Sequence, residues 1–443
     1  MTRVARLLAV AALTVLSQCG APAAHAVSPP PVDDKWLPQP GLPAPPRPTV
    51  QREVCAAVAA DPGPARPPHH AGPPAQFGDL DLPRVWQLTR GAGQRIAIID
   101  TGVARHRRLP NLVPGGDYVY TGDGTQDCDA HGTLVAAIIA ATKDPKDSEA
   151  DDFSGVAPEA TLISIRQSSA KFGPAGNRSS IGFGDVDTMA KAVRTAADLG
   201  ASVINISTVA CVAAASALDD RALGAALAYA VDVKNAVVVA AAGNTGGAAQ
   251  CPPQRPDATW DTVTVAVSPA WYDDYVLTVG SVNAVGAPSA FTLAGPWVDV
   301  AAVGEGVSSL GSAPLSGTSY AAPVVSGLAA LIRARFPALT ARQVMQRIES
   351  TAHHPPARWA PLVGNGTIDA LAAVSTDSVP PSATAKPQAM PAPTAAPRRP
   401  DRHARNTAFV GAAVCLAVLL AALAAGAATR RLGRSRRDDV PGD

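Results

Sequence analysis

Residues 95–102 read RIAIIDTG, a short run of mostly apolar, β-branched residues that ends at Asp100. A run without polar alternation predicts a strand buried on both faces, as strands of parallel sheets are. Similar runs recur along the chain, separated by segments with helical spacing of apolar residues. This alternation predicts a one-domain α/β fold, with a mostly parallel sheet between layers of helices. The other expected strands are 161–166, 202–207, 236–241 and 276–282, and the expected helices are 134–141, 186–199, 217–233 and 320–335.

Three motifs carry the residue types that a serine hydrolase needs. Asp100 ends the first strand, at the sheet edge where reacting groups gather in open α/β folds. His131 begins the run HGT, and Ser319 lies in GTSYAAP at the start of an expected helix. A serine hydroxyl is a weak nucleophile, which an imidazole activates by taking its proton while a carboxylate holds the imidazole in the right tautomer. We therefore expect these three residues to form a catalytic triad.

The chain resembles the subtilisin-like proteases, the subtilases of peptidase family S8. The order Asp, His, Ser is that of subtilisin. Residues 94–374 also carry GVAP at 155–158 and AAGN at 241–244. The resemblance implies a three-layer subtilisin-like fold and a serine endopeptidase that acts on proteins or peptides. It further implies that His131 is general base and then general acid, and that Asn244 donates its amide N–H to the oxyanion beside the backbone N–H of Ser319.

One run departs from the subtilisin pattern. Many subtilisins have Ser-Leu-Gly along the cleft, where this chain has Ser207, Thr208 and Val209. The main chain of such a run can still pair with a peptide substrate. The β-branched residues favour a shallower floor of the first specificity pocket.

Composition excludes several functions. The 443 residues carry a formal net charge of +1, which gives no field suited to nucleic acid. The sequence has no CxxC pair and no Cys/His cluster with ligand spacing, so we expect no metal site and no cofactor. The pair Asp151 and Asp152 leaves calcium binding open as an alternative, although an exposed acidic loop is the favoured interpretation.

The two ends of the chain predict export and membrane anchoring. Residues 1–26 have a positive start, an apolar core and an Ala-His-Ala cleavage site, typical of a signal peptide. Residues 407–428 are uncharged and match the roughly 20 residues that span a membrane. The expected segments are a signal peptide (1–26), a Pro-rich extension (27–75), the peptidase domain (76–374), a Pro-rich linker (375–406), a transmembrane helix (407–428) and a cytoplasmic tail (429–443).

Four cysteines remain in the exported region, where oxidising conditions favour disulfides. Three pairings are possible, and we favour Cys55 with Cys128 and Cys211 with Cys251. The first pair would attach the N-terminal extension three residues before His131. The extension has too few alternating apolar residues for a folded pro-domain, so we expect it to stay attached.

The order of these segments, with the runs TRGAGQRIAIIDTGV and SPAWYDDYVLTVGSV, resembles the mycosins, membrane-anchored proteases of actinobacterial type VII secretion systems. The resemblance implies proteolysis outside the cytoplasmic membrane, with membrane components of a secretion complex as partners. The alternative is a mainly structural scaffold of that complex, in which catalysis is dispensable.

Overall fold

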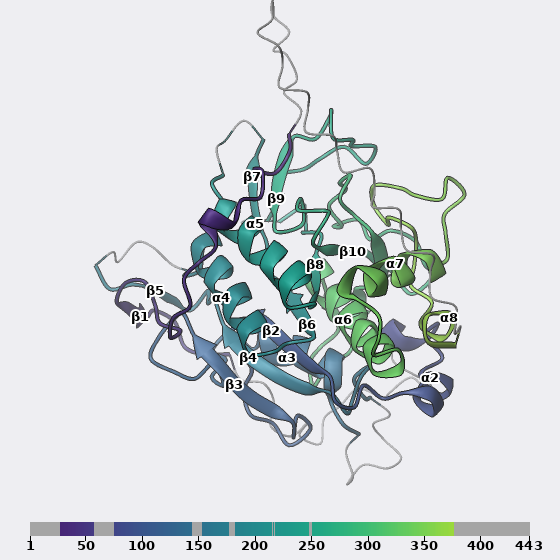
Figure 1. Cartoon of the computed structure of the whole chain (residues 1–443), viewed down its shortest axis with the longest axis horizontal. Helices are drawn as coiled ribbons and strands as arrows, with labels where there is room; N and C mark the ends of the chain where they lie inside the picture. The colour runs from purple at the N-terminus through teal and green to yellow at the C-terminus, as the bar shows by residue number, and fades with distance from the viewer. Residues whose placement is uncertain are drawn as a thin grey trace, which may run out of the picture. The chain divides into compact units, whose positions relative to one another are not determined.

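A seven-stranded sheet forms the centre of the protein in the computed structural model, and all neighbouring strands in it are parallel (Figure 1). The structure describes residues 27–56, 75–143, 153–176, 182–214, 216, 218–247 and 250–375. The strand order is β11-β10-β8-β6-β2-β4-β3. The strands are β2 (Arg95–Asp100), β3 (Leu112–Asp117), β4 (Thr161–Arg166), β6 (Val203–Ile206), β8 (Val237–Ala241), β10 (Leu277–Val282) and β11 (Val300–Val303).

The strands expected from the sequence are the inner strands of this sheet. In β6, β8 and β10 every residue is buried, and in β2 and β4 every residue after the first is. Successive side chains of a strand point to opposite faces, so complete burial requires cover on both faces. The two edge strands were not expected, because β3 reads LVPGGD and β11 is short.

Helices supply that cover in two groups. Helix α3 packs against α6 and β2, whereas α4 packs against α5 and also contacts β2 (Figure 1). The result is the expected three-layer arrangement. The helices are α2 (Leu82–Leu88), α3 (His131–Ala140), α4 (Val186–Asp198), α5 (Arg221–Ala228), α6 (Thr318–Arg335), α7 (Ala341–Thr351) and α8 (Ala370–Ser375), with short turns η1 (Asp34–Trp36), η2 (Ala75–Phe77) and η3 (Tyr229–Val233).

The helix expected at 217–233 begins later than its apolar pattern suggests. Asp220 precedes α5 and is buried, and its carboxylate accepts hydrogen bonds from Ser268, Trp271 and Tyr272. These tertiary bonds fix the backbone before the first helical residue. The last turn then continues as the π-helical segment η3.

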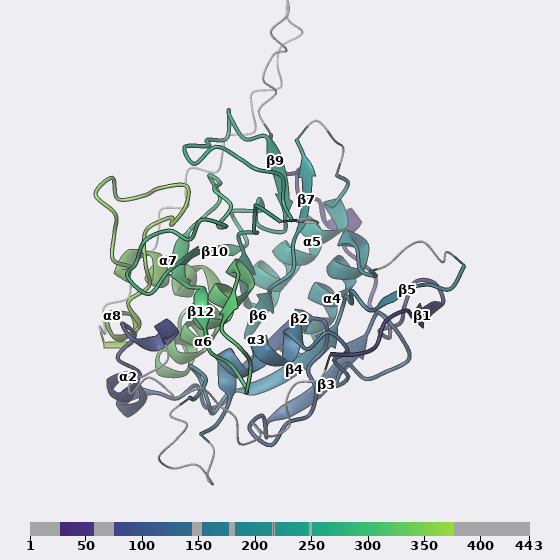
Figure 2. The same cartoon turned by 180° about the vertical axis from the view of Figure 1, so that it is seen from behind.

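The described residues also form three short antiparallel ribbons outside the seven-stranded sheet, and Figure 2 shows β7, β9 and β12 of these from behind. The ribbon β7–β9 is joined to a neighbouring loop by a disulfide between Cys211 and Cys251. The ribbons are β1 (Thr49–Gln51) with β5 (Phe172–Pro174), β7 (Ala210–Ala213) with β9 (Val265–Ser268), and β12 (Glu305–Val307) with β13 (Leu315–Ser316).

The N-terminal extension, described for residues 27–56, runs along the surface of the domain (Figure 1). The ring of Trp36 lies 3.8 Å from the Arg221 guanidinium carbon, measured to the ring centroid, and the Pro38 carbonyl accepts a bond from Arg194. The described part of the extension includes strand β1, which pairs with β5. It is thus held by side chains and by one short ribbon.

Within the described ranges, no helix is long and apolar enough to cross a membrane. The expected transmembrane segment at 407–428 lies outside those ranges, as do the expected signal peptide and cytoplasmic tail.

We expect Gly327→Ala to destabilise the protein by about 1–3 kcal/mol, because a core packed to native density does not absorb an added methyl group. A Cβ at Gly327, inside α6, would lie 2.6 Å from the Cβ of Val156. This clash outweighs the roughly 1 kcal/mol by which alanine favours a helix over glycine. Urea unfolding measures the change. The control is Gly176→Ala, where an added Cβ meets nothing within 4 Å; equal midpoints for the two variants would contradict the packing argument.

Candidate active site

The three residues expected to form a triad lie together at one edge of the sheet. Asp100 ends β2, His131 begins α3, and Ser319 lies in the first turn of α6. The His131 Nδ1 atom lies 2.7 Å from Asp100 Oδ1, and its Nε2 atom lies 3.1 Å from Ser319 Oγ. Asp100 is fully buried, while the His131 side chain is 26% exposed and so reachable from solvent. An imidazole hydrogen-bonded in this way can pass a proton between a hydroxyl and an incoming or leaving group.

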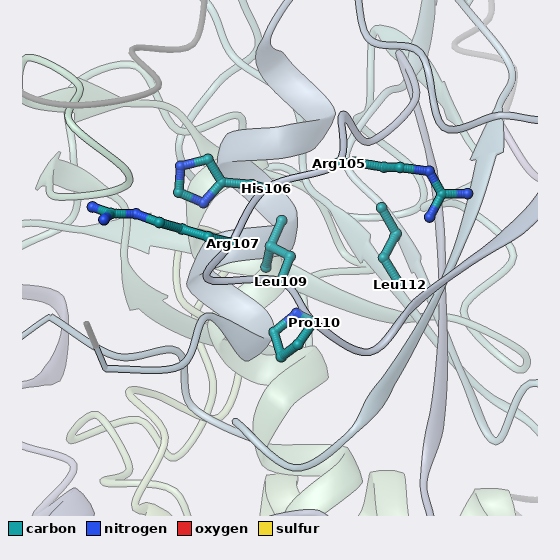
Figure 3. Close-up of a pocket in the computed structure, with 6 residues that line it drawn as sticks. All are labelled: Arg105, His106, Arg107, Leu109, Pro110 and Leu112. Atoms are coloured by element: carbon teal, nitrogen blue, oxygen red, sulfur yellow. The ribbon is translucent and has the colours of Figure 1, made fainter. Parts of the chain in front are cut away.

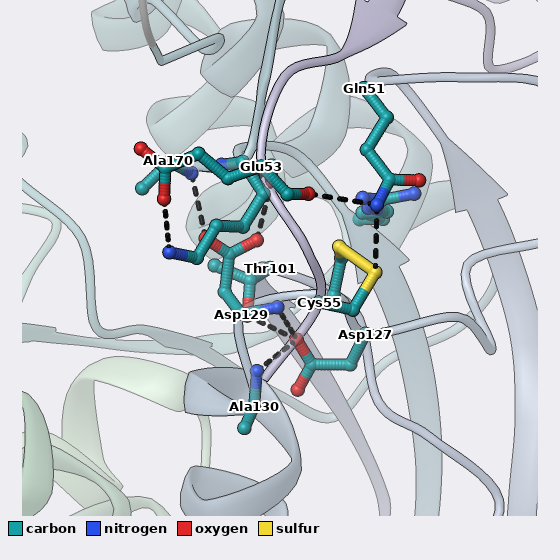
Figure 4. The surroundings of a disulfide bond; sticks show 12 residues. Gln51, Glu53, Cys55, Thr101, Asp127, Asp129, Ala130 and Ala170 are labelled. Carbon is teal, nitrogen blue, oxygen red and sulfur yellow. Dashed lines mark hydrogen bonds and ion pairs between the residues drawn. A yellow bond between two sulfur atoms is a disulfide. The ribbon is translucent and has the colours of Figure 1, made fainter. Parts of the chain in front are cut away.

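A second carboxylate, Asp127, connects the β2 loop to helix α3. Its Oδ1 accepts from Thr101 Oγ1 at 2.9 Å and from two backbone N–H groups of the turn that follows, those of Asp129 and Ala130 (Figure 4). Its Oδ2 accepts from the backbone N–H and the hydroxyl of Thr133, at 2.8 and 2.6 Å. A carboxylate that bonds the first free N–H groups of a helix acts as its cap.

This cap explains why α3 begins at His131 and not at the expected residue 134. Thr101 also accepts a bond from the backbone N–H of Gly132, so the residues beside Asp100 and His131 are joined directly. Sequence reasoning missed Asp127. The sequence feature that could have revealed it was a carboxylate four residues before His131.

The surrounding charges set the protonation of His131. Burial of the ring lowers its pKa, but the charge and hydrogen bond of Asp100, with the charges of Asp127 and Asp129, raise it more. The net effect raises the pKa of His131 above its ordinary value. The ring of Tyr320 lies beside the imidazole, with 5.3 Å between ring centroids. Burial, reinforced by the charge of Asp100, raises the pKa of Tyr320 to about 12, so its phenol is neutral at ordinary pH.

Asn244 is oriented by the residue that precedes the nucleophile. Its Oδ1 accepts from the backbone N–H and the hydroxyl of Thr318, at 2.9 and 3.0 Å. The amide Nδ2 of Asn244 takes no part in these two bonds. A Cβ built on Gly317 would lie 3.1 Å from Ser319 Oγ and 3.3 Å from Asn244 Nδ2, so both groups lie close to the same side of Gly317.

Buried polar side chains fix the other side of the nucleophile. Ser207 Oγ donates to the Ser319 carbonyl at 3.0 Å and accepts from Asn205 Nδ2 at 2.9 Å. Ser326 lies further along α6, and its Oγ donates to Asn205 Oδ1 at 2.8 Å. This chain of bonds joins β6 to α6. Neither Asn205 nor Ser326 was expected, since single polar residues within apolar runs carry no distinctive pattern.

The disulfide between Cys55 and Cys128 attaches the N-terminal extension to the loop that carries Asp127 (Figure 4). Both disulfides of the structure follow the pairing favoured from the sequence. On the other side of Cys128, the Asp129 carboxylate accepts from the backbone N–H of Ala170 at 2.8 Å. Glu53 pairs with Lys171 at 2.5 Å. The extension thus supports the loop before His131 from outside.

Two pockets lie near these loops. One, of about 310 Å³, is formed by the loop between β2 and β3 and is rich in basic side chains (Figure 3). The other, of about 250 Å³, begins at Thr245, next to Asn244, and is lined in part by Gln254 and Leu293. The first pocket is lined by Arg105, His106, Arg107, Leu109, Pro110 and Leu112.

Within the described parts of the chain, no group of three or more His, Cys, Asp or Glu residues is placed to hold a metal ion. Asp151 and Asp152, the alternative calcium ligands, lie outside those parts.

The three-layer fold and the chain order of Asp100, His131 and Ser319 are those of the subtilisin class of proteins. A model of the Subtilase family matches residues 91–381. Mycosin-4 of Mycobacterium tuberculosis is 70% identical to this chain, and the match covers 100% of this chain and 99% of Mycosin-4. The chain therefore belongs to the subtilase family of serine proteases and, within it, to the mycosins.

Solved structures agree with this assignment. The MycP3 protease from the type VII (ESX-3) secretion system is 44% identical, with a TM-score of 0.72 over 79% of this chain and 100% of that one. A chain of an intact ESX-5 inner membrane complex is 40% identical, with a TM-score of 0.71 over 91% of this chain and 100% of that one.

The raised pKa of His131 predicts how reactivity depends on pH. Only the neutral imidazole can take the proton of Ser319, so the rate of labelling by a fluorophosphonate should fall on the acid side with a midpoint above about 6.5, the ordinary histidine pKa. Asp127→Asn removes a negative charge that favours the imidazolium, and should move this midpoint to lower pH. Labelling rates measured between pH 5 and 9 test both expectations.

The control is Glu159→Gln, which removes an exposed carboxylate that pairs with Arg90 on the surface. Its midpoint should equal that of the parent protein. A parent midpoint at or below about 6.5 would contradict the expected direction of the shift.

Proposed function

We propose that the chain is an active serine endopeptidase with Asp100, His131 and Ser319 as its catalytic triad. The observation that carries this proposal is the pair of distances at His131, 2.7 Å to the carboxylate and 3.1 Å to the hydroxyl. A single imidazole hydrogen-bonded to both groups needs no rearrangement to start acyl transfer.

The reaction uses each contact in turn. Asp100 holds the Nδ1–H of His131, which leaves Nε2 free to accept the Ser319 proton as Oγ attacks the peptide carbonyl carbon. The carbonyl oxygen becomes negative in the space beside Gly317, where Asn244 Nδ2 and the Ser319 backbone N–H donate to it. His131 then gives its proton to the departing amine. Water then attacks the acyl-enzyme, with His131 again as general base and then general acid, and the carboxylic acid product leaves Ser319.

Labelling with a fluorophosphonate probe tests the assembled site. The parent protein should be modified at Ser319, and Ser319→Ala and His131→Ala should not be modified, as read by the mass of the labelled peptide. A folded parent protein that fails to react would contradict the proposal.

Asn244→Ala tests the oxyanion contact separately. In subtilisin, loss of such a side-chain donor costs about 10²–10³ in kcat. We expect a similar fall in kcat here with little change in KM, because the contact strengthens as charge develops on the oxygen. Asn365→Ala, at an Asn that bonds the Asp299 carbonyl away from the triad, is the matched control. An unchanged kcat for Asn244→Ala would remove Asn244 from the mechanism.

The proposal places the peptidase domain outside the cytoplasmic membrane. It includes removal of residues 1–26, a linker at 375–406 and a membrane span at 407–428, all supported by the sequence pattern. Under this proposal the four cysteines lie in an oxidising compartment, in keeping with the two disulfides.

We further propose that the protein acts with the membrane components of a type VII secretion complex. Support comes from its likeness to a chain of the ESX-5 inner membrane complex over 91% of its length. This likeness also favours the second candidate function, a structural role in which catalysis is dispensable.

A secretion assay separates the two roles. If the role is structural, deletion of the gene should abolish secretion, while Ser319→Ala should restore it as well as the parent protein does. If proteolysis is required, Ser319→Ala should fail to restore it although the protein is present at parental levels. Normal secretion by the deletion strain would contradict any role in the complex.

A further inference from the structure

The two hydrogen bonds of the His131 imidazole hold the ring only at its edge. Its Nδ1 atom lies 2.7 Å from Asp100 Oδ1 and its Nε2 atom lies 3.1 Å from Ser319 Oγ. The torsion that turns a histidine ring about its Cβ–Cγ bond has broad minima. A contact against the side of the ring therefore narrows its orientation further than the two bonds do.

The aromatic ring of Tyr320 makes such a contact. Its centroid lies 5.3 Å from the centroid of the His131 imidazole, and the two ring planes are inclined by 45°. The Tyr320 side chain is partly buried and packs against the hydrophobic core, and its backbone N–H donates to the Gly317 carbonyl at 3.0 Å. Because Ser319 is the preceding residue of α6, one helical turn carries both the nucleophile and the ring beside its base.

The ring of Tyr320, and not its hydroxyl, provides this contact. No hydrogen bond joins the hydroxyl to another residue in the part of the chain that the structure describes. Burial, reinforced by the charge of Asp100, raises the pKa of Tyr320 to about 12. The phenol therefore neither gives nor takes a proton in the pH range in which His131 titrates.

An aromatic ring stabilises a cation that lies within about 6 Å of its centroid. The imidazole becomes such a cation during the proposed reaction, when Nε2 takes the serine proton. Tyr320 is the titratable neighbour on α6 and, because it is neutral, it acts through its ring. The charged groups that act on the imidazole from the other elements are Asp100, at the end of β2, and Asp127 and Asp129, in the loop before α3.

We propose that Tyr320 is a positioning residue, whose ring holds the His131 imidazole in line with Asp100 and Ser319 and stabilises the imidazolium that forms during acyl transfer. The proposal rests on the proposed function, since it takes His131 as the general base. Removal of the aromatic ring should have two effects. Proton transfer should become slower, and the imidazole should lose its proton at a lower pH.

Rates of Ser319 labelling by a fluorophosphonate, measured between pH 5 and 9 on the full-length protein in detergent, test both effects. Tyr320→Leu keeps an apolar side chain beside the imidazole but has no aromatic face. We expect its rate on the alkaline plateau to fall by about 2–30-fold and its acid midpoint to lie about 0.4–1.5 pH units lower, the range that cation–π interactions give. Tyr320→Phe keeps the ring and should keep the parental rate and midpoint.

Tyr229→Leu is the matched control. It removes the same kind of ring from η3, where the Tyr229 centroid lies 4.3 Å from the Arg194 guanidinium carbon, and should leave the labelling rate and the midpoint unchanged. Rates are compared per folded protein, as measured by urea unfolding of each variant. If Tyr320→Leu does not fold, Tyr320→Met, which is also apolar and has no ring, takes its place.

A structural role alone would lower the plateau rate of Tyr320→Leu and leave its midpoint unchanged, or would impair Tyr320→Phe as much as Tyr320→Leu. Either result would overturn the proposal, as would parental rates for Tyr320→Leu at every pH, and the triad would stand in all three cases. If the folded parent protein fails to react at any pH, the proposed function fails, and the role of Tyr320 with it.

Discussion

The hydrogen bonds of the Asp127 carboxylate are the constraint on which the active-site geometry depends. The histidine of the proposed triad is separated from the aspartate by 31 residues and from the serine by 188. Such groups react efficiently only when their positions are held within about 0.5 Å. Asp127 meets this demand by joining the loop after β2 to the first turn of α3. On the other side, the bonds of Ser207 and Asn244 fix the start of α6.

The same carboxylates that fix these loops also set the proton affinity of the imidazole. Asp100, Asp127 and Asp129 all favour the imidazolium, which forms as the serine proton is transferred. A cluster of negative charge around the buried Asp100 is unfavourable by itself. Here each of the two additional carboxylates accepts N–H or O–H groups, and the charge of Lys171 also acts on Asp129. In the proposed mechanism, one set of residues thus provides both the structural support of the loops and the charge that stabilises the imidazolium.

Local patterns in the sequence were enough for the inner strands and the main helices, and for the grouping of Asp100, His131 and Ser319, because burial on both faces and motif order are local signals. Edge strand β3 was missed because proline and two glycines interrupt its apolar pattern. The start of α3 was missed because its cap is provided from outside the helix by Asp127. The shallower floor of the first specificity pocket, expected from Thr208 and Val209, stays a prediction.

The disulfide between Cys55 and Cys128 determines whether cleavage of the chain releases the N-terminal extension. It closes a ring of chain with a sequence separation of 73 residues. A peptide-bond cut anywhere inside that ring would open a new N-terminus without freeing the extension, which stays linked through sulfur. Maturation by such a cut would yield a two-chain enzyme whose intact mass rises by only one water molecule. Only after reduction would the pieces separate, so a gel run without reductant would show one unbroken species.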